Sequence, residues 1–183
     1  MLLGYDRLRV HNSISRRSFG KLLAAVPLAG TFAPLGRAFG AERNMFLSLN
    51  SVLLQGRVHW PDFARLAAQI GFPGTDIMLR QAMQAGVNTT NDLLAGLKIR
   101  PAVIDFPVEF RKDDATFKAS LTQLEAAAQF AAAIHCPRMI TYILPSSDTP
   151  KDELRQIYKQ RFTESAQILA RSNVRLEIGR AHV

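Results

Sequence analysis

Four strand-then-helix units follow one another between residues 46 and 173, and a fifth strand begins at Val174. Each expected strand is a short apolar run, which is typical of parallel strands that are buried on both faces. No hairpin dipeptide such as Asn-Gly joins them, so the pattern predicts parallel pairing through right-handed crossovers. The four complete strands are expected at Asn44–Asn50, Thr75–Leu79, Ile99–Phe106 and Met139–Leu144.

Parallel pairing leaves two α/β architectures open, a closed barrel and an open, doubly wound sheet. The chain lacks a Gly-x-Gly-x-x-Gly turn after its first strand, which removes the usual reason to prefer a dinucleotide-binding sheet. A complete eightfold barrel takes ~250 residues, and this chain has 183. We therefore expect the amino-terminal half of a (β/α)8 TIM barrel, with about four βα units and the start of strand five.

The helices between the strands are expected to differ in length. Gly86 and Asn88–Thr90 interrupt the stretch after strand two, which leaves Asp92–Leu97 as a short helix. After strand three, Asp113 or Asp114 is expected to cap one long helix with a continuous apolar stripe.

Charge and cysteine content limit the partners. The net charge is +8, of which residues 1–40 contribute +5, so only +3 belongs to the rest of the chain. No basic run with interleaved aromatic residues appears there, and we expect no nucleic-acid partner. The single cysteine, Cys136, excludes an intramolecular disulfide, and we interpret it as a buried, inert thiol.

The first 41 residues have the pattern of an export signal. Arg16 and Arg17 precede the modestly apolar stretch Leu22–Gly30, and small residues follow up to Gly40 and Ala41. This segment resembles the bacterial twin-arginine signal peptide, which implies the twin-arginine translocation machinery as a partner and a periplasmic or secreted location. The apolar stretch is shorter than the ~20 residues of a spanning helix, so we expect no permanent membrane anchor.

Three segments, Gly71–Ile77, Pro107–Arg111 and Thr141–Asp148, resemble the sugar phosphate isomerase/epimerase group of xylose-isomerase-like barrels. We assign residues 42–176 to a partial barrel of this kind. The resemblance implies a metal-dependent enzyme that moves a proton next to the carbonyl of a sugar or polyol substrate. It also implies a divalent Mn, Mg or Zn ion, held in the family by two Glu, an Asp and a His on strands five to eight. No metal ligand or catalytic residue is assigned in this sequence.

Two other functions remain open for a barrel of this superfamily. One is a non-catalytic sugar-binding barrel that has lost the metal ligands, and the other is an abasic-site endonuclease-like barrel. Export and the modest charge of the mature chain argue against the endonuclease. Because half of the expected site lies outside the sequence, we expect a chain that ends here to be inactive.

The last seven residues, 177–183, are interpreted as an artefact. Codons for Ile178–Val183 can read ATC GGA AGA GCA CAC GTC, which resembles a common sequencing-library adapter. The two preceding bases also fit the adapter, so Glu177 would owe only its first base to the gene. Glu177 and His182 therefore do not count as metal ligands.

Candidate substrate contacts are the polar residues that follow the expected strands. We predict a role in substrate binding for Glu109, Arg111, Tyr142, Ser146 and Trp60. Each has a structural alternative. Glu109 and Arg111 would form a solvated ion pair in a loop. Trp60, which follows His59, would pack at the start of a helix. Three further residues qualify by position alone, and backbone satisfaction or capping would explain them equally well: Asn50, Asp76 and Asp148.

Overall fold

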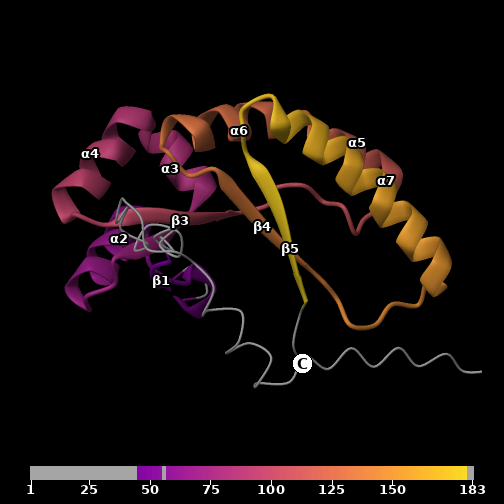
Figure 1. Cartoon of the computed structure of the whole chain (residues 1–183), viewed down its shortest axis with the longest axis horizontal. Coiled ribbons are helices and arrows are strands. Elements are labelled where there is room, and N and C mark those ends of the chain that lie inside the picture. The colour runs from indigo at the N-terminus through magenta and orange to yellow at the C-terminus, as the bar shows by residue number, and fades with distance from the viewer. Residues whose placement is uncertain (1–44, 55–56, 181–183) are drawn as a thin grey trace, which may run out of the picture. The chain divides into compact units, whose positions relative to one another are not determined.

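The computed structural model describes residues 45–54 and 57–180 (Figure 1). The predicted signal with Arg16 and Arg17, and also His182, lie outside the described residues. Five strands form one sheet in the order β1-β2-β3-β4-β5, and every neighbouring pair is parallel. The strands are β1 (Ser48–Leu49), β2 (Gly74–Ile77), β3 (Arg100–Asp105), β4 (Arg138–Ile143) and β5 (Arg175–Arg180). Parallel pairing in chain order confirms the predicted topology.

Helices connect the strands and pack on one another along the sheet (Figure 1). α2 contacts α4, α4 contacts α3, α3 contacts α6, and α6 contacts α7. Both α2 and α7 also contact strands. No helix of the described residues is long and apolar enough to cross a membrane. The helical segments are η2 (Ser51–Leu54), α2 (Trp60–Gln69), α3 (Leu79–Ala85), α4 (Val87–Leu97), α5 (Asp114–Leu121), α6 (Leu124–Ala133) and α7 (Lys151–Ala170).

The two outer strands differ in extent from the prediction. β1 has only two residues, because the flanking Met45 and Leu47 are 79% and 75% exposed and make no sheet pairs. β5 runs on through Arg180, and its residues pair with β4 in continuous register. Backbone pairing does not distinguish a genomic codon from an adapter codon, so the origin of residues 177–183 stays a prediction.

Two helix predictions were wrong. Asn88–Thr90 lie inside α4, where the buried Thr90 hydroxyl donates to the Ala82 carbonyl at 3.4 Å. The predicted break at Gly86 is confirmed: at φ +90° this residue separates α3 from α4, in a backbone conformation that glycine adopts at little cost. The single long helix after strand three is two helices, α5 and α6, separated by Thr122 and Gln123. The Asp113 cap is confirmed, since its carboxylate accepts from the Thr116 N–H at 3.0 Å.

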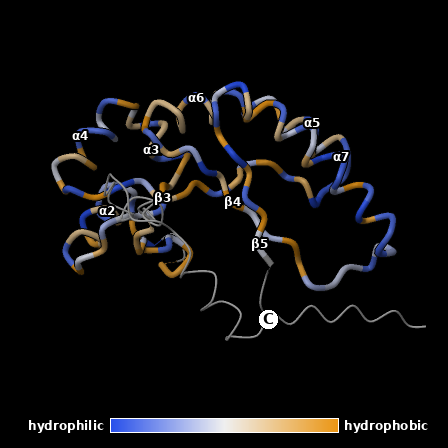
Figure 2. The backbone as a smooth tube through the Cα atoms, viewed as in Figure 1, coloured by the Kyte–Doolittle hydropathy of each residue, from blue (hydrophilic) through white to orange (hydrophobic). Residues whose placement is uncertain are grey.

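The core lies between the sheet and the helices, and Figure 2 shows α7 coloured mainly hydrophilic over it. Cys136 is fully buried in this core. Burial raises the pKa of its thiol to about 11, so the thiol stays protonated near neutral pH and is a poor nucleophile. The prediction of a buried cysteine is confirmed, and the raised pKa agrees with an inert thiol. The largest fully buried side chains include Trp60, Phe63, Phe110, Phe117 and Leu124.

Candidate functional site

Two aspartates lie at the carboxyl ends of β2 and β3. The Asp76 side chain is buried, and its Oδ1 accepts from the Ser48 hydroxyl at 3.1 Å. Its Oδ2 accepts a hydrogen bond from the backbone N–H of Ser51 at 3.3 Å. Asp76 therefore connects β2 to β1 and to the turn that follows β1, and backbone satisfaction explains its position. Asp105 ends β3 and is open to solvent, so it can reach a ligand.

Both carboxyl groups have raised pKa values. Burial is the main cause for Asp76, the charge of Asp105 adds to it, and the hydrogen bonds from Ser51 and Ser48 oppose it. Partial removal of the Asp105 carboxyl from water raises its pKa as well. Sequence reasoning missed Asp105 as a site residue. The available signal was the one that identified Asp76, an acidic residue at the end of an apolar strand.

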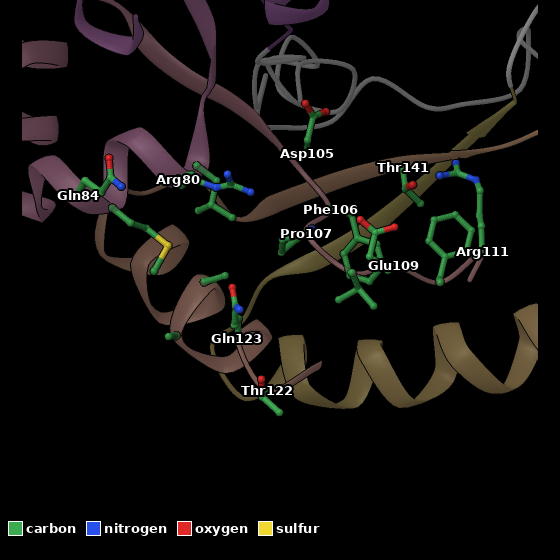
Figure 3. A pocket seen from close by; sticks show the side chains of 16 residues that line it. Arg80, Gln84, Asp105, Phe106, Pro107, Glu109, Arg111, Thr122, Gln123 and Thr141 are labelled. Carbon is green, nitrogen blue, oxygen red and sulfur yellow. The ribbon is translucent and has the colours of Figure 1, made fainter. Parts of the chain in front are cut away.

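A cavity of about 820 Å³ opens beside the segment that joins β3 to α5 (Figure 3). Glu109 and Arg111, two of the predicted substrate contacts, both line it, and Asp105 lies at its β3 end. The wall therefore combines carboxylates and guanidinium groups with apolar surface, a composition common in small-molecule sites. Its polar lining residues are Arg80, Gln84, Asp105, Glu109, Arg111, Thr122, Gln123 and Thr141.

Arg111 and Tyr142 are brought together. The Arg111 guanidinium donates a hydrogen bond to the Tyr142 carbonyl. Its central carbon lies 4.7 Å from the centre of the Tyr142 ring and 4.2 Å from that of Phe110. Cation–π contacts of this kind hold a guanidinium in one orientation. The Glu109 backbone N–H donates to the Ser120 hydroxyl at 3.1 Å, and no ion pair joins Glu109 to Arg111 within the described chain.

Ser146 and Asp148 lie elsewhere. Both line a second hollow, of about 900 Å³, between the loop after β4 and the first half of α7. Neither residue lines the cavity that holds Glu109 and Arg111. Asn50 makes a local turn, because its side-chain oxygen accepts from the Val52 N–H at 2.8 Å. Glu177 is exposed on β5, paired in register with Ile140.

The position of Trp60 corrects the idea that its ring forms a wall for a sugar. Trp60 begins α2 and is only 1% exposed, so its ring offers no surface to a ligand. Its backbone N–H donates to the side-chain oxygen of Gln81 at 2.7 Å. The indole Nε1 is buried and has no hydrogen-bond partner among the described residues. Packing at the start of the helix, the alternative interpretation, accounts for these contacts.

The described residues do not fit a metal ion. No group of three or more His, Cys, Asp or Glu side chains in this part of the chain could hold one. Asp76 and Asp105 are too few, and both oxygens of Asp76 already face hydrogen-bond donors. No part of the chemistry of these residues is therefore assigned to a metal.

Replacing Asp105 with asparagine is expected to raise the thermal unfolding midpoint at pH 7 and to leave it nearly unchanged near pH 3. A raised folded-state pKa means that stability is lost as the pH rises from 3.8, the ordinary value, through the folded-state pKa. Asparagine removes that charge and its repulsion of Asp76. Thermal scans at both pH values test this.

Asp113 provides the opposite control for this measurement. Hydrogen bonds from the Thr116 side chain and backbone lower its pKa, so its stabilising effect is present above pH 3.8 and is lost as the pH falls through the lowered value. Asp113→Ala is expected to lower the midpoint at pH 7. A lower midpoint for Asp105→Asn at pH 7 would contradict the assignment of Asp105 as an unfavourably placed carboxylate.

Several solved structures resemble this chain. A xylose isomerase domain protein from Alicyclobacillus acidocaldarius matches with a TM-score of 0.62 and 16% identity, over 72% of this chain and 48% of that one. The IOLI protein with a binding zinc atom matches with a TM-score of 0.63 and 12% identity, over 74% and 51%. D-psicose 3-epimerase from Clostridium cellulolyticum, solved with D-tagatose, matches with a TM-score of 0.57 and 11% identity, over 72% of this chain and 51% of that one. No family model matches the sequence, and no curated protein matches it significantly.

The chain spans about half the length of these solved structures. At such low identities the likeness is one of fold, and it agrees with the parallel order of the five strands. The described chain has an α/β fold with a parallel five-stranded sheet, similar to the fold of the TIM-barrel structures that it matches.

Proposed function

We propose that this chain supplies one side of the substrate site of a sugar or polyol isomerase or epimerase. The observation that carries the proposal is the cavity at the carboxyl end of β3, where Asp105, Glu109 and Arg111 line one space. In TIM barrels this end of the strands holds the chemistry. The resemblance of Pro107–Arg111 to the isomerase/epimerase group supports the same end of the sheet.

The lining residues suit a ligand with many hydroxyl groups. The carboxylates of Asp105 and Glu109 accept hydrogen bonds from hydroxyls, and the Arg111 guanidinium donates to a carbonyl or hydroxyl oxygen. Because Arg111 is already oriented by the Tyr142 carbonyl and two rings, little freedom is lost when it binds a ligand. These residues bind and orient the substrate in our proposal. The proposal assigns the proton transfer to none of them.

Metal dependence and export belong to the proposal as well. The resemblance implies Mn, Mg or Zn, and one protein of similar fold was solved with a zinc atom. The described residues do not fit an ion, so its ligands would come from another part of the protein. Arg16 and Arg17 support export through the twin-arginine machinery to the periplasm or the medium.

The proposal is tested with the complete protein from the source locus, incubated with a panel of keto and aldo sugars in D2O, with Mn²⁺ and after chelation. NMR is expected to show deuterium at the carbon next to the carbonyl, because the reaction exchanges that proton with solvent. Arg111→Met is expected to lower kcat/KM by about 10- to 100-fold, since it removes a charged hydrogen-bond donor from the site. Chelation is expected to abolish exchange.

Arg65→Met is the matched control. Arg65 lies on α2, its side chain is 53% exposed, and its one ion-pair partner among the described residues is Asp62, three residues earlier. This substitution is expected to leave kcat/KM unchanged. Sugar binding without deuterium incorporation would favour the non-catalytic barrel over the enzyme, and cleavage of abasic DNA without sugar turnover would favour the endonuclease.

A further inference from the structure

Arg161 reaches from α7 to the segment that carries Glu109 and Arg111. Its side chain is only 11% exposed, although α7 is otherwise a largely hydrophilic helix (Figure 2). Its Nη1 donates to the Phe110 carbonyl at 2.9 Å and to the Lys112 carbonyl at 2.6 Å. These two carbonyls lie on either side of Arg111. One largely buried guanidinium therefore holds the backbone at the centre of the segment.

Further contacts fix the orientation of that guanidinium. Its Nη2 lies 3.7 Å from Asp114 Oδ1, and its central carbon lies 4.9 Å from the centre of the Phe117 ring. Both partners are on α5, which follows the segment directly. Arg161 thus joins three parts of the fold: α7, the end of the β3–α5 segment, and the first turns of α5.

The side chains of the same segment are anchored to α7 as well. The Phe110 ring lies 4.8 Å from the Phe162 ring and 5.4 Å from the Tyr158 ring, measured between centroids. Phe110 is buried in the core, and it lines the cavity together with its neighbours Glu109 and Arg111. Fixing the Phe110 backbone therefore fixes the backbone positions from which the Glu109 and Arg111 side chains extend.

We infer that Arg161 is a positioning residue for the substrate site, which acts by fixing the segment that presents Glu109 and Arg111. The role of the site rests on the proposed function, whereas the effect on the segment does not. Only arginine suits this task. Its planar group offers several N–H donors in a fixed geometry and stacks on a ring, whereas lysine has a single compact ammonium.

The test compares Arg161→Met, Arg161→Lys and a control, Arg155→Met. Arg155 lies six positions earlier on α7, where it pairs with Asp152 at 3.1 Å and where the two side chains are 65% and 91% exposed. Hydrogen exchange followed by mass spectrometry reports the amides of residues 106–113 and, separately, those of helix α6, which packs against the core with one face. Urea unfolding gives the global stability of each variant, and kcat and KM are measured in the complete protein.

Arg161→Met is expected to speed exchange in residues 106–113 by about 10-fold or more while α6 keeps its protection, since only a local opening is released. Arg161→Lys is expected to restore part of the protection, and Arg155→Met to change nothing. In the complete protein, Arg161→Met is expected to lower kcat/KM by about 10-fold or more. Part of this loss is expected in kcat, because misplaced groups no longer align with the substrate.

Two outcomes would overturn the inference. Exchange that rises equally in the segment and in α6 would mean that Arg161 only stabilises the whole fold. Unchanged exchange in residues 106–113 would mean that it does not position the segment at all. Failure of the proposed function is recognised separately: faster local exchange in a protein that turns over no sugar supports the positioning effect and removes the isomerase.

Discussion

Replacing Phe110 with alanine is expected to lower the free energy of unfolding by about 3–5 kcal/mol, the range measured for buried phenylalanines. The Phe110 ring is 1% exposed and is surrounded by three aromatic rings, those of Phe106, Tyr158 and Phe162. Alanine would leave a cavity between α7 and the β3–α5 segment, because helix and sheet elements cannot collapse fully onto it. Urea unfolding followed by circular dichroism measures the loss.

Two further variants identify the cause of that loss. Phe110→Leu keeps most of the volume and is expected to cost clearly less than the alanine variant, since the cavity term is smaller. Leu53→Ala removes an equally apolar side chain that is 72% exposed, and it is expected to stay within about 0.5 kcal/mol of the parent. Equal losses for Phe110→Ala and Leu53→Ala would show that burial is not what makes Phe110 important.

The sequence predicted the inner strands well, for a physical reason. β3 and β4 lie inside the sheet, and alternate positions of their apolar runs are buried, among them Ala102, Ile104 and Met139. The apolar pattern therefore coincides with the strands. The same pattern overestimated β1. Met45 and Leu47 are as apolar as the central residues, but an edge strand has a neighbour on one side only. Local sequence carries no information about which strand lies at an edge.

Helix breaks were harder to predict, since side chains compete with the backbone in ways that depend on neighbours. Thr90 lies inside α4, because its hydroxyl donates a hydrogen bond to the Ala82 carbonyl of the preceding helix. Thr122 bonds instead to the Ala119 carbonyl three residues earlier, where α5 ends. The same residue type therefore continues one helix and ends another. The partner, not the residue type, decides the outcome.

The candidate site was predicted in part. Position after a strand was enough to select Glu109 and Arg111, which share a cavity, and Tyr142, which contacts Arg111. The same rule also selected Ser146, which lies at another hollow. Arg161 could not be found this way, because it lies in the middle of a hydrophilic helix 51 residues from the carbonyl that it binds. Its role depends entirely on how α7 packs.

Replacing Trp60 is expected to have the second large effect on the free energy of unfolding, and the size of the loss depends on the replacing residue. Trp60→Ala is expected to cost about 3–5 kcal/mol, because a large buried ring is lost from the start of α2. Trp60→Phe is expected to cost much less. It keeps most of the apolar ring and removes an indole N–H that is buried without a partner among the described residues, so part of the packing loss is offset.

The chain contains one tryptophan, so circular dichroism rather than tryptophan emission must follow unfolding of these variants. In the parent chain, that single emission tests the other interpretation of Trp60. A ring that is 1% exposed is expected to resist quenching by acrylamide and to be indifferent to added sugar. Strong quenching that sugar relieves would return Trp60 to the substrate site. Equal losses for the alanine and phenylalanine variants would show that the buried ring is not what makes Trp60 important, because phenylalanine keeps most of that ring and both variants lose the N–H.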